Sequence, residues 1–304
     1  MNPTKDSRVK QIDICLQKAA NFADCRAGSI TARGLAALTS GRPERLRSAG
    51  MAYNFRVANF ALIGSPVSHS LSPLIMGKLG LSYRAREVLA GKLGDFIRAE
   101  ASGLKGFNIT SPLKEEIIPF MARLSWEAKE TRSVNCAVRR GDSWEGYNTD
   151  YLGVLVAVDY LGLMPNRALI LGTGPGARAA AFAMRERGVG FTLVSRRPGP
   201  GRLNWDDLGP EVLEQHDLII SATPPGAIPL PACHLGPHNF VLDMNYGERA
   251  KDLRAAVAGT PAGYCDGIAV LLGQAAGSLE LWLGGNFADW KERVFSVAAD
   301  LKLI

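Results

Sequence analysis

The sequence predicts an α/β protein with two domains separated by a cleft. Its 304 residues exceed the ~100–200 residues that are typical of one domain. Short apolar stretches of strand length alternate with stretches of good helix formers, which is the order expected of parallel sheets covered by helices. One apolar stretch, residues 168–171, runs through a glycine-rich turn directly into a helix. With 47% hydrophobic and 21% charged residues, the composition is that of a globular protein.

The first 50 residues differ from the rest of the chain. They contain nine Lys or Arg and four Asp or Glu, so +5 of the net charge of +6 lies there. Apolar residues between Val9 and Ala23 recur at helical spacing, and the stretch after Gly28 is rich in Arg, Ser, Gly and Pro. We expect a poorly ordered extension. Its acidic residues disfavour a transit peptide, and we favour translation starting at Met51. The near-neutral remainder lacks a basic stripe, so we expect no nucleic-acid partner.

The cysteines and histidines indicate the compartment and the absence of a metal. The five cysteines are scattered and form no Cys-x-x-Cys pair, as expected of a protein in the reducing cytoplasm. The four histidines show no metal-ligand spacing with them, so we expect no zinc site. No run of about 18 apolar residues is present, and we therefore expect no membrane span.

Two of the first three expected strands end in polar loops. A strand over Phe55–Ile63 is followed by a serine-rich loop, 64–73, that contains His69 and leads into a helix, with Ser72 as its N-cap. These hydroxyls are suited either to capping or to binding a polyhydroxylated ligand. A strand over Tyr83–Val88 and a helix over Leu93–Ser102 precede a short strand and a second polar loop, 108–116.

Lys114 and Asp150 are the candidate reactive side chains of this half. Lys114 is expected near the first turn of a helix, where a cation opposes the helix dipole and a functional role is favoured. After strand residues 133–138, a Gly141-Asp142 turn predicts a hairpin. Asp150 then stands where the second hairpin strand gives way to a helix over Tyr151–Leu161. It can act as an N-cap, as a catalytic carboxylate, or as both.

The turn after residues 168–171 matches a dinucleotide-binding fingerprint. It reads Gly-x-Gly-x-x-Ala between a strand and a helix, which is the context that gives the motif its meaning in a Rossmann domain. The first glycine permits the tight turn, the second lets a pyrophosphate approach the backbone, and the helix N-terminus attracts the anion. The predicted phosphate-binding residues are Gly172, Thr173, Gly174, Pro175, Gly176 and Ala177.

The next strand, Phe191–Val194, favours NADP over NAD. It ends in Ser195, Arg196 and Arg197, where an NAD-binding protein would carry Asp or Glu for the ribose hydroxyls. Arginine binds a 2′-phosphate through charge and a fork of donors. A strand over 217–221 leads to a loop with Thr223, suited to the nicotinamide half. A strand over Phe240–Tyr246, a helix opening at Gly267 and a helix over Trp290–Leu303 complete the chain.

Together these motifs resemble those of the shikimate dehydrogenases, in family order and spacing from about Phe55 to Leu283. The segments that carry the resemblance are 64–73, 108–116, 148–150, 172–177, 221–223 and 267–276. The resemblance implies an enzyme that interconverts 3-dehydroshikimate and shikimate by hydride transfer with NADP(H), in aromatic amino-acid biosynthesis. It also implies a discontinuous substrate domain, residues 51–153 and 268–304, and a Rossmann domain, residues 154–267.

The resemblance further implies a role for individual residues. Lys114 and Asp150 form the pair at the reacting oxygen. The residues implied to hold the substrate are Ser70, Ser72, Asn108, Thr110, Asn135, Tyr246 and Gln274. The residues implied to bind NADP are 172–177 together with Ser195, Arg196, Arg197, Thr223 and Gly267. A monomer or homodimer with a small-molecule substrate is expected.

Several positions depart from the family pattern. Cys136 replaces a threonine, Val270 replaces a methionine, a proline after Tyr246 is missing, and an Asn-Arg-Thr motif reads Ser195-Arg196-Arg197. These changes leave two alternatives open: a quinate/shikimate dehydrogenase of broader substrate and cofactor use, and a non-catalytic binding paralogue. The presence of both Lys114 and Asp150 counts against the second alternative.

Overall fold

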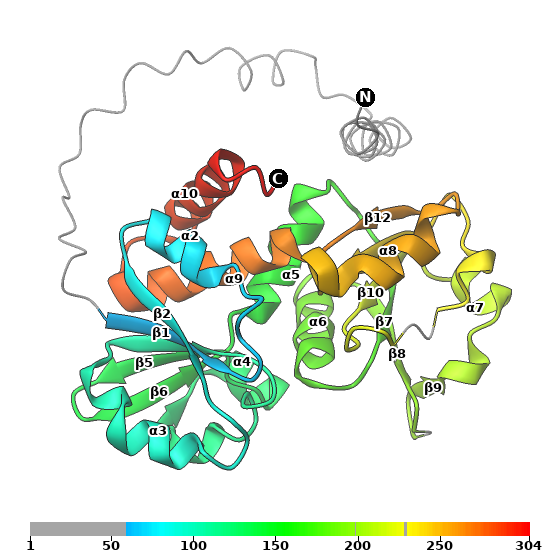
Figure 1. The fold of residues 1–304 in the computed structure, drawn as a ribbon. Helices are drawn as coiled ribbons and strands as arrows, with labels where there is room; N and C mark the ends of the chain where they lie inside the picture. Colours follow the sequence, from blue (N-terminus) through cyan, green and yellow to red (C-terminus); the bar gives the residue numbers. More distant parts are fainter. Residues whose placement is uncertain (1–58, 198, 228–229) are drawn as a thin grey trace. The chain divides into compact units, whose positions relative to one another are not determined.

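Two six-stranded sheets form the framework of the protein (Figure 1). This computed structural model describes residues 59–197, 199–227 and 230–304. The extension over residues 1–50, and residues 55–58 of the first predicted strand, lie outside the described residues. Within the described ranges, no helix combines the length and the apolar character needed to cross a bilayer. The predicted α/β fold class is confirmed.

The first sheet is mixed and has the strand order β2-β1-β3-β5-β6-β4. β1 pairs in parallel with β2 and β3, while β3, β5 and β6 are antiparallel, with the predicted hairpin joining β5 to β6. Its strands are β1 (Asn59–Gly64), β2 (Ser82–Glu87), β3 (Gly106–Ile109), β4 (Arg123–Leu124), β5 (Cys136–Arg140) and β6 (Ser143–Tyr147). Its helices are α2 (Ser72–Lys78), α3 (Leu93–Ala99) and α4 (Trp126–Thr131).

The second sheet is fully parallel and has the order β12-β11-β10-β7-β8-β9. Its central strands are buried apolar runs, as a sheet covered on both faces requires. Its strands are β7 (Arg167–Leu171), β8 (Gly190–Ser195), β9 (Arg202–Asn204), β10 (Leu218–Ser221), β11 (Phe240–Asp243) and β12 (Gly263–Cys265). Its helices are α6 (Pro175–Glu186), α7 (Pro210–Glu214) and α8 (Lys251–Ala258).

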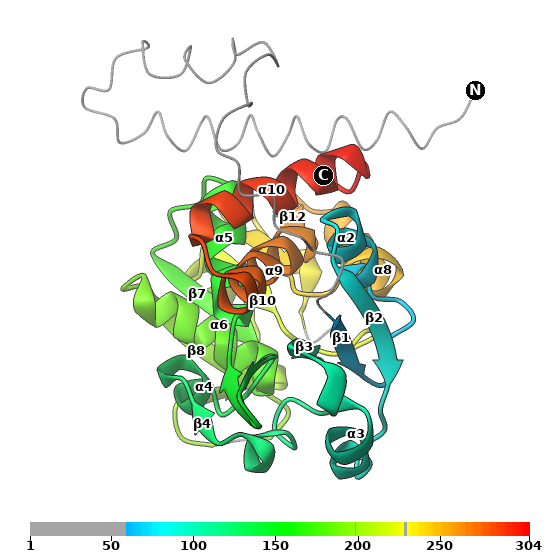
Figure 2. The same ribbon diagram turned by 90° about the vertical axis from the view of Figure 1, so that its left-hand side faces the viewer.

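Helices α5 (Asp150–Tyr160) and α9 (Ile268–Leu283) run between the two sheets (Figures 1 and 2). Small residues let them approach closely: a Cβ added at Gly153 would lie 2.3 Å from the carbonyl oxygen of Val270. Farther along α9, Trp282 stacks on Phe60 of β1 at a ring separation of 4.7 Å. The close approach of the two helices at Gly153 therefore fixes the start of α5 against α9. Helix α10 (Phe287–Asp300) ends the chain.

Some predicted elements differ from the observed ones. Residues 111–117 form successive turns followed by a short 3₁₀ helix (Ile118–Phe120), so Lys114 does not lie in an α-helix and the helix-dipole reasoning was wrong. Ser72 is the first residue of α2 and makes no cap hydrogen bond. The strand predicted over Phe240–Tyr246 ends at Asp243, because the amide N–H of Asn245 turns back onto the Asp243 carboxylate. The division into two domains at residues 153 and 268 stays a prediction.

Candidate active site

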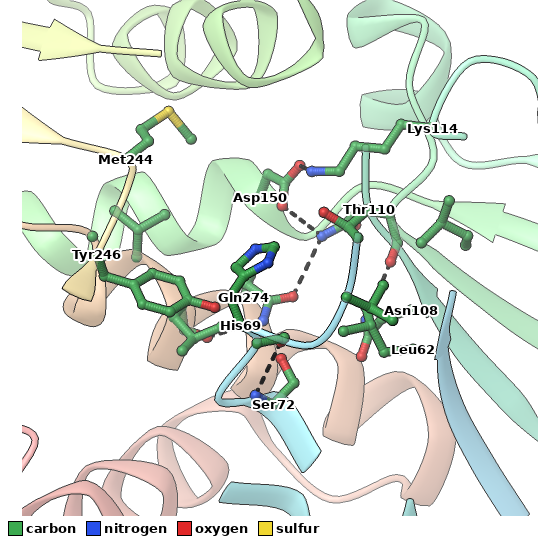
Figure 3. A pocket seen from close by; sticks show the side chains of 17 residues that line it. Leu62, His69, Ser72, Asn108, Thr110, Lys114, Asp150, Met244, Tyr246 and Gln274 are labelled. Carbon is green, nitrogen blue, oxygen red and sulfur yellow. Dashed lines mark hydrogen bonds and ion pairs between the residues drawn. The ribbon is translucent and has the colours of Figure 1, made fainter. Parts of the chain in front are cut away.

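The predicted reactive and substrate-binding side chains meet in one pocket (Figure 3). The pocket is open to solvent and has a volume of about 150 Å³. Parallel strands of the first sheet bring two polar loops, 64–73 and 108–116, to its edge. Its lining includes Ser70, Ser72, Asn108, Thr110, Lys114, Asn135, Asp150, Tyr246 and Gln274. Nine side chains selected from the sequence thus surround one space.

Lys114 and Asp150 are in direct contact. The Lys114 Nζ donates to Asp150 Oδ2 over 2.6 Å, with the two side chains 17% and 10% exposed. Asn135 Nδ2 donates to the other oxygen, Asp150 Oδ1, over 2.7 Å, and its Oδ1 accepts the Thr149 amide N–H at 2.6 Å. Asp150 is the first residue of α5, and Thr149 is the N-cap. The carboxylate is therefore oriented by two donors, Lys114 and Asn135, while the lysine faces the pocket.

Asn108 is held by a buried network behind the pocket. Its Nδ2 donates to Ser278 Oγ over 2.8 Å and to the Asn135 carbonyl over 3.2 Å, and its Oδ1 accepts the Tyr83 hydroxyl at 2.8 Å. Burial raises the pKa of Tyr83, which keeps the phenol protonated as a donor. Since both amide hydrogens of Asn108 are used, only a lone pair on Oδ1 is left to accept from a ligand.

The opposite side of the pocket carries hydroxyls and a histidine. Ser70 Oγ accepts the amide N–H of Ser72 at 3.2 Å. His69 also lines the pocket; the sequence left it open as a ligand contact together with the serines of its loop, although the family resemblance gave it no role. Burial, followed by the charge of Arg249, lowers its pKa and favours the neutral imidazole. The sequence signal for a place in the pocket was the position of His69 in the serine-rich loop.

Cys136, which replaces the family threonine, lies out of the pocket. Its side chain is fully buried beneath Asn135 on β5, and burial raises the pKa of the thiol. The thiol therefore stays protonated at neutral pH and packs as a small apolar group.

The glycine-rich turn has the geometry that a pyrophosphate requires. Gly172 has φ +114°, a backbone conformation that L side chains rarely adopt. A Cβ at Gly174 would meet no atom within 4 Å among the described residues, so the backbone of the turn is open to a ligand. Gly174 is also the N-cap of α6; Pro175 has no N–H, so the amides of Gly176 and Ala177 are the ones at the helix start that can bind an anion. These features fit a dinucleotide.

The region after β8 fits a 2′-phosphate. Ser195 Oγ accepts the amide N–H of Arg197 at 3.2 Å, and the Arg196 guanidinium lies over the Trp205 ring, 5.6 Å from its centroid. Both arginines are exposed, and neither forms an ion pair within the part of the chain that the structure describes. These two guanidinium groups, which no carboxylate of the described residues neutralises, can therefore bind the dianionic 2′-phosphate.

The cofactor residues are separated from the pocket, with one exception. Of the predicted set, only Gly267 lines it. Met244 connects the two regions, because it lines the pocket and its Sδ would lie 3.6 Å from a Cβ added at Gly176. Thr223 lies behind this connection: its carbonyl accepts Asn245 Nδ2 at 3.0 Å. A ligand that extends from the turn past Met244 would reach Lys114.

Asp243 anchors the segment that carries Met244 and Tyr246. Its Oδ1 accepts the amide N–H and the side-chain amide of Asn245, at 2.9 and 3.0 Å. The carboxyl is 1% exposed, and this burial, with a contribution from the charge of Asp266, raises its pKa from 3.8 to about 6. The folded state therefore binds the proton of Asp243 more tightly than the unfolded state does.

Replacing Asp243 with Asn should change how stability depends on pH. The stability that proton binding contributes is fully present below pH 3.8 and is lost as pH rises through about 6. Asn has no such titration and keeps an oxygen that accepts the Asn245 amide. We expect the unfolding free energy of Asp243→Asn, relative to the parent protein, to rise by about 2 kcal/mol between pH 4 and pH 7. Urea unfolding of both proteins between pH 4 and pH 7 measures this difference in unfolding free energy. A difference that does not vary with pH would contradict the raised pKa of Asp243.

Comparisons with known proteins agree with this geometry. A family model described as the shikimate dehydrogenase substrate-binding domain matches residues 62–137. Shikimate dehydrogenase (NADP(+)) of Aeropyrum pernix is 35% identical over 267 residues, covering 79% of this chain and 96% of that protein. The Xylella fastidiosa protein of the same name is 34% identical over 263 residues, covering 75% and 92%. The crystal structure of Thermus thermophilus shikimate 5-dehydrogenase with NADP(H) and shikimate superposes with a TM-score of 0.63, at 28% identity, covering 79% of this chain and 99% of that one.

Proposed function

Since this chain belongs to the shikimate dehydrogenase family, we propose that its pocket catalyses the reversible NADP-linked oxidation of shikimate to 3-dehydroshikimate. The contact between Lys114 Nζ and Asp150 Oδ2, 2.6 Å long and facing the pocket, is the observation that carries the proposal. Oxidation of a secondary alcohol needs a group that accepts the hydroxyl proton, and reduction needs one that returns it. The pair supplies both.

The neighbouring side chains orient the ring of the substrate. Ser70 and Ser72 supply hydroxyl groups for its carboxylate, at the start of α2. Asn108, with only an acceptor left, accepts from a ring hydroxyl, and Thr110 and Gln274 lie beside it. A ring held from both ends presents one carbon to the region of Gly267 and Met244.

The pair handles the proton of the reacting hydroxyl. Lys114 lies against that oxygen. In reduction its ammonium stabilises the developing negative charge, gives the oxygen a proton and becomes a neutral amine, and in oxidation the neutral amine takes that proton back. Asp150, held by Asn135, keeps the ammonium in place and balances its charge in a largely buried site. Residues 172–177 would hold NADP, which when bound would supply the hydride acceptor for the same carbon.

The cofactor and the domain assignment follow from the same proposal. Residues 172–177 would hold the pyrophosphate, Ser195, Arg196 and Arg197 the 2′-phosphate, and Thr223 and Gly267 the nicotinamide half. Residues 51–153 and 268–304 would form the substrate domain, and residues 154–267 the NADP-binding domain. The scattered cysteines support a location in the reducing cytoplasm, and a monomer or homodimer is proposed from the family resemblance alone.

Initial rates with two substrates and two cofactors test the proposal. The purified chain should reduce NADP with shikimate, at a kcat/KM well above the values for quinate or for NAD. Comparable rates with quinate would assign it to the broader quinate/shikimate class. Binding of shikimate and NADP without turnover would identify a non-catalytic paralogue and overturn the proposal.

A further inference from the structure

Arg178, on the first turns of α6, is not part of the pocket and has no role in the reaction proposed above. We propose that it is a positioning residue, which holds the loop 131–134 and thereby the Lys114–Asp150 pair in place relative to the glycine-rich turn. The inference rests on the proposed function, because it concerns the geometry of that same reaction.

The Arg178 guanidinium joins the two regions through four acceptors. Its Nε donates to the carbonyl of Thr131, and its Nη1 donates to the carbonyl of Thr173 in the glycine-rich turn over 3.2 Å. Its Nη2 donates to Glu115 Oε1 over 2.6 Å and to the Arg132 carbonyl over 3.2 Å. The side chain is 27% exposed. One planar cation thus contacts the cofactor turn, the end of α4 and the residue after Lys114.

The end of α4 needs such a partner. The last carbonyls of a helix accept no hydrogen bond from within the helix, and the helix dipole favours a cation near them. Here the C-cap, Arg132, adopts a left-handed conformation with φ 46°. Arg178 supplies the hydrogen bonds and the charge from the neighbouring helix, so it fixes where the loop 131–134 begins.

One path leads from Arg178 to Lys114. Glu115, which contacts the guanidinium, is the next residue in the chain after Lys114. The backbone of Lys114 is also tied to the clamped loop, because its carbonyl accepts the Val134 amide N–H at 2.9 Å. The lysine backbone is therefore held on both sides by groups whose position depends on Arg178.

A second path leads to Asp150. Thr131, whose carbonyl accepts from Arg178, also accepts Asn148 Nδ2 at its Oγ1 over 3.1 Å. Asn148 Oδ1 in turn accepts the amide N–H of Asp150 at 3.0 Å. Both members of the reactive pair are thus connected to the same guanidinium through hydrogen bonds of at most 3.2 Å.

The geometry requires arginine. A guanidinium offers five donors in a rigid plane, whereas a lysine ammonium is a point with three donors and cannot reach four acceptors that lie around a fork. Arg178→Lys keeps the charge and most of the aliphatic stem, so it isolates the loss of the fork. Arg185→Lys is the matched control: Arg185 also joins α6 to α4, through a 2.8 Å ion pair with Glu130, but it is 52% exposed and, within the described ranges, forms no hydrogen bond or ion pair with a residue that lines the pocket.

Steady-state kinetics of the two variants test the inference. Arg178→Lys should lower kcat for shikimate oxidation by about 10- to 100-fold and leave KM for shikimate within about threefold, because a displaced pair affects chemistry more than binding. Arg185→Lys should match the parent protein. In a Lys114→Met background, Arg178→Lys should cause no further loss, because it acts through the lysine. An equal effect of the two arginine variants, or fully multiplicative losses in the double variant, would overturn the inference.

A measurement that needs no turnover accompanies the kinetics. Amide hydrogen exchange should increase in residues 131–135 of Arg178→Lys and not of Arg185→Lys. Unchanged protection there would overturn the inference whether or not the parent protein oxidises shikimate. Absence of shikimate oxidation by the parent protein, with the exchange difference present, would instead contradict the proposed function alone.

Discussion

Replacing Lys114 with methionine is expected to lower kcat for shikimate oxidation by about 10³-fold, with KM for shikimate changed only a few-fold. Methionine keeps the unbranched stem and removes the ammonium. The oxygen of the substrate then loses its proton acceptor and donor, while the groups that hold the ring, such as Ser72 and Asn135, stay in place. Steady-state rates followed by NADPH absorbance give both constants.

The control for this variant is Lys105→Met, because Lys105 is exposed and lies outside the pocket. Loss of Lys114 leaves Asp150 without its cation, although Asn135 Nδ2 still donates to it. Shikimate binding by calorimetry shows whether the pocket survives. A Lys114→Met protein that binds shikimate and keeps parent kcat would remove the lysine from the chemistry.

Neutralising Arg196 and Arg197 together is expected to raise KM for NADP by about 100-fold and to leave kcat/KM for NAD nearly unchanged. Each arginine is exposed and free of ion pairs within the described ranges, so each can contribute a charge-assisted hydrogen bond to the 2′-phosphate. Two such bonds, weakened by solvent, account for an effect of about that size. Glutamine at both positions removes the charge and keeps a similar length.

NAD is the internal control for the double variant, since it lacks the 2′-phosphate. Arg202→Gln is a second control, because Arg202 is an exposed arginine on the adjacent strand β9. Fluorescence titration with NADPH measures affinity without turnover. An equal loss of affinity for both cofactors would show that the arginines support the fold of this region and do not bind the 2′-phosphate.

The fold, the glycine-rich turn and the two candidate reactive residues could be predicted because their signals are local, whereas the substrate-binding residues of the pocket were implied by the family resemblance. The turn 172–177 stands between a buried strand and a helix, and that context needs no distant information. Lys114 and Asp150 stand 36 residues apart, yet each follows a strand end. Parallel pairing of β1 and β3 brings the polar loops after these strands to one edge of the first sheet.

The contacts behind the pocket could not be predicted, because they join residues with no shared local pattern. Asn108 and Ser278 are 170 residues apart, and Arg178 meets Glu115 across 63 residues. A sequence motif identifies Asn108 but not the Ser278 hydroxyl and the Asn135 carbonyl, which take both of its amide hydrogens and leave it only as an acceptor. The wrong helix at Lys114 has a similar origin: the carbonyls of Ser111 and Lys114 accept from the distant amides of Ser65 and Val134 instead of continuing a helix, and the sequence does not show these partners.

The most direct test of the account follows the hydrogen that leaves the substrate. Shikimate deuterated at the carbon that is oxidised should yield NADPH carrying one deuterium, with a lower single-turnover rate than unlabelled shikimate. Mass spectrometry of the isolated cofactor and rapid-mixing absorbance give both results. Reduced NADP without deuterium, or no reduction while both ligands are bound, would contradict hydride transfer in this pocket.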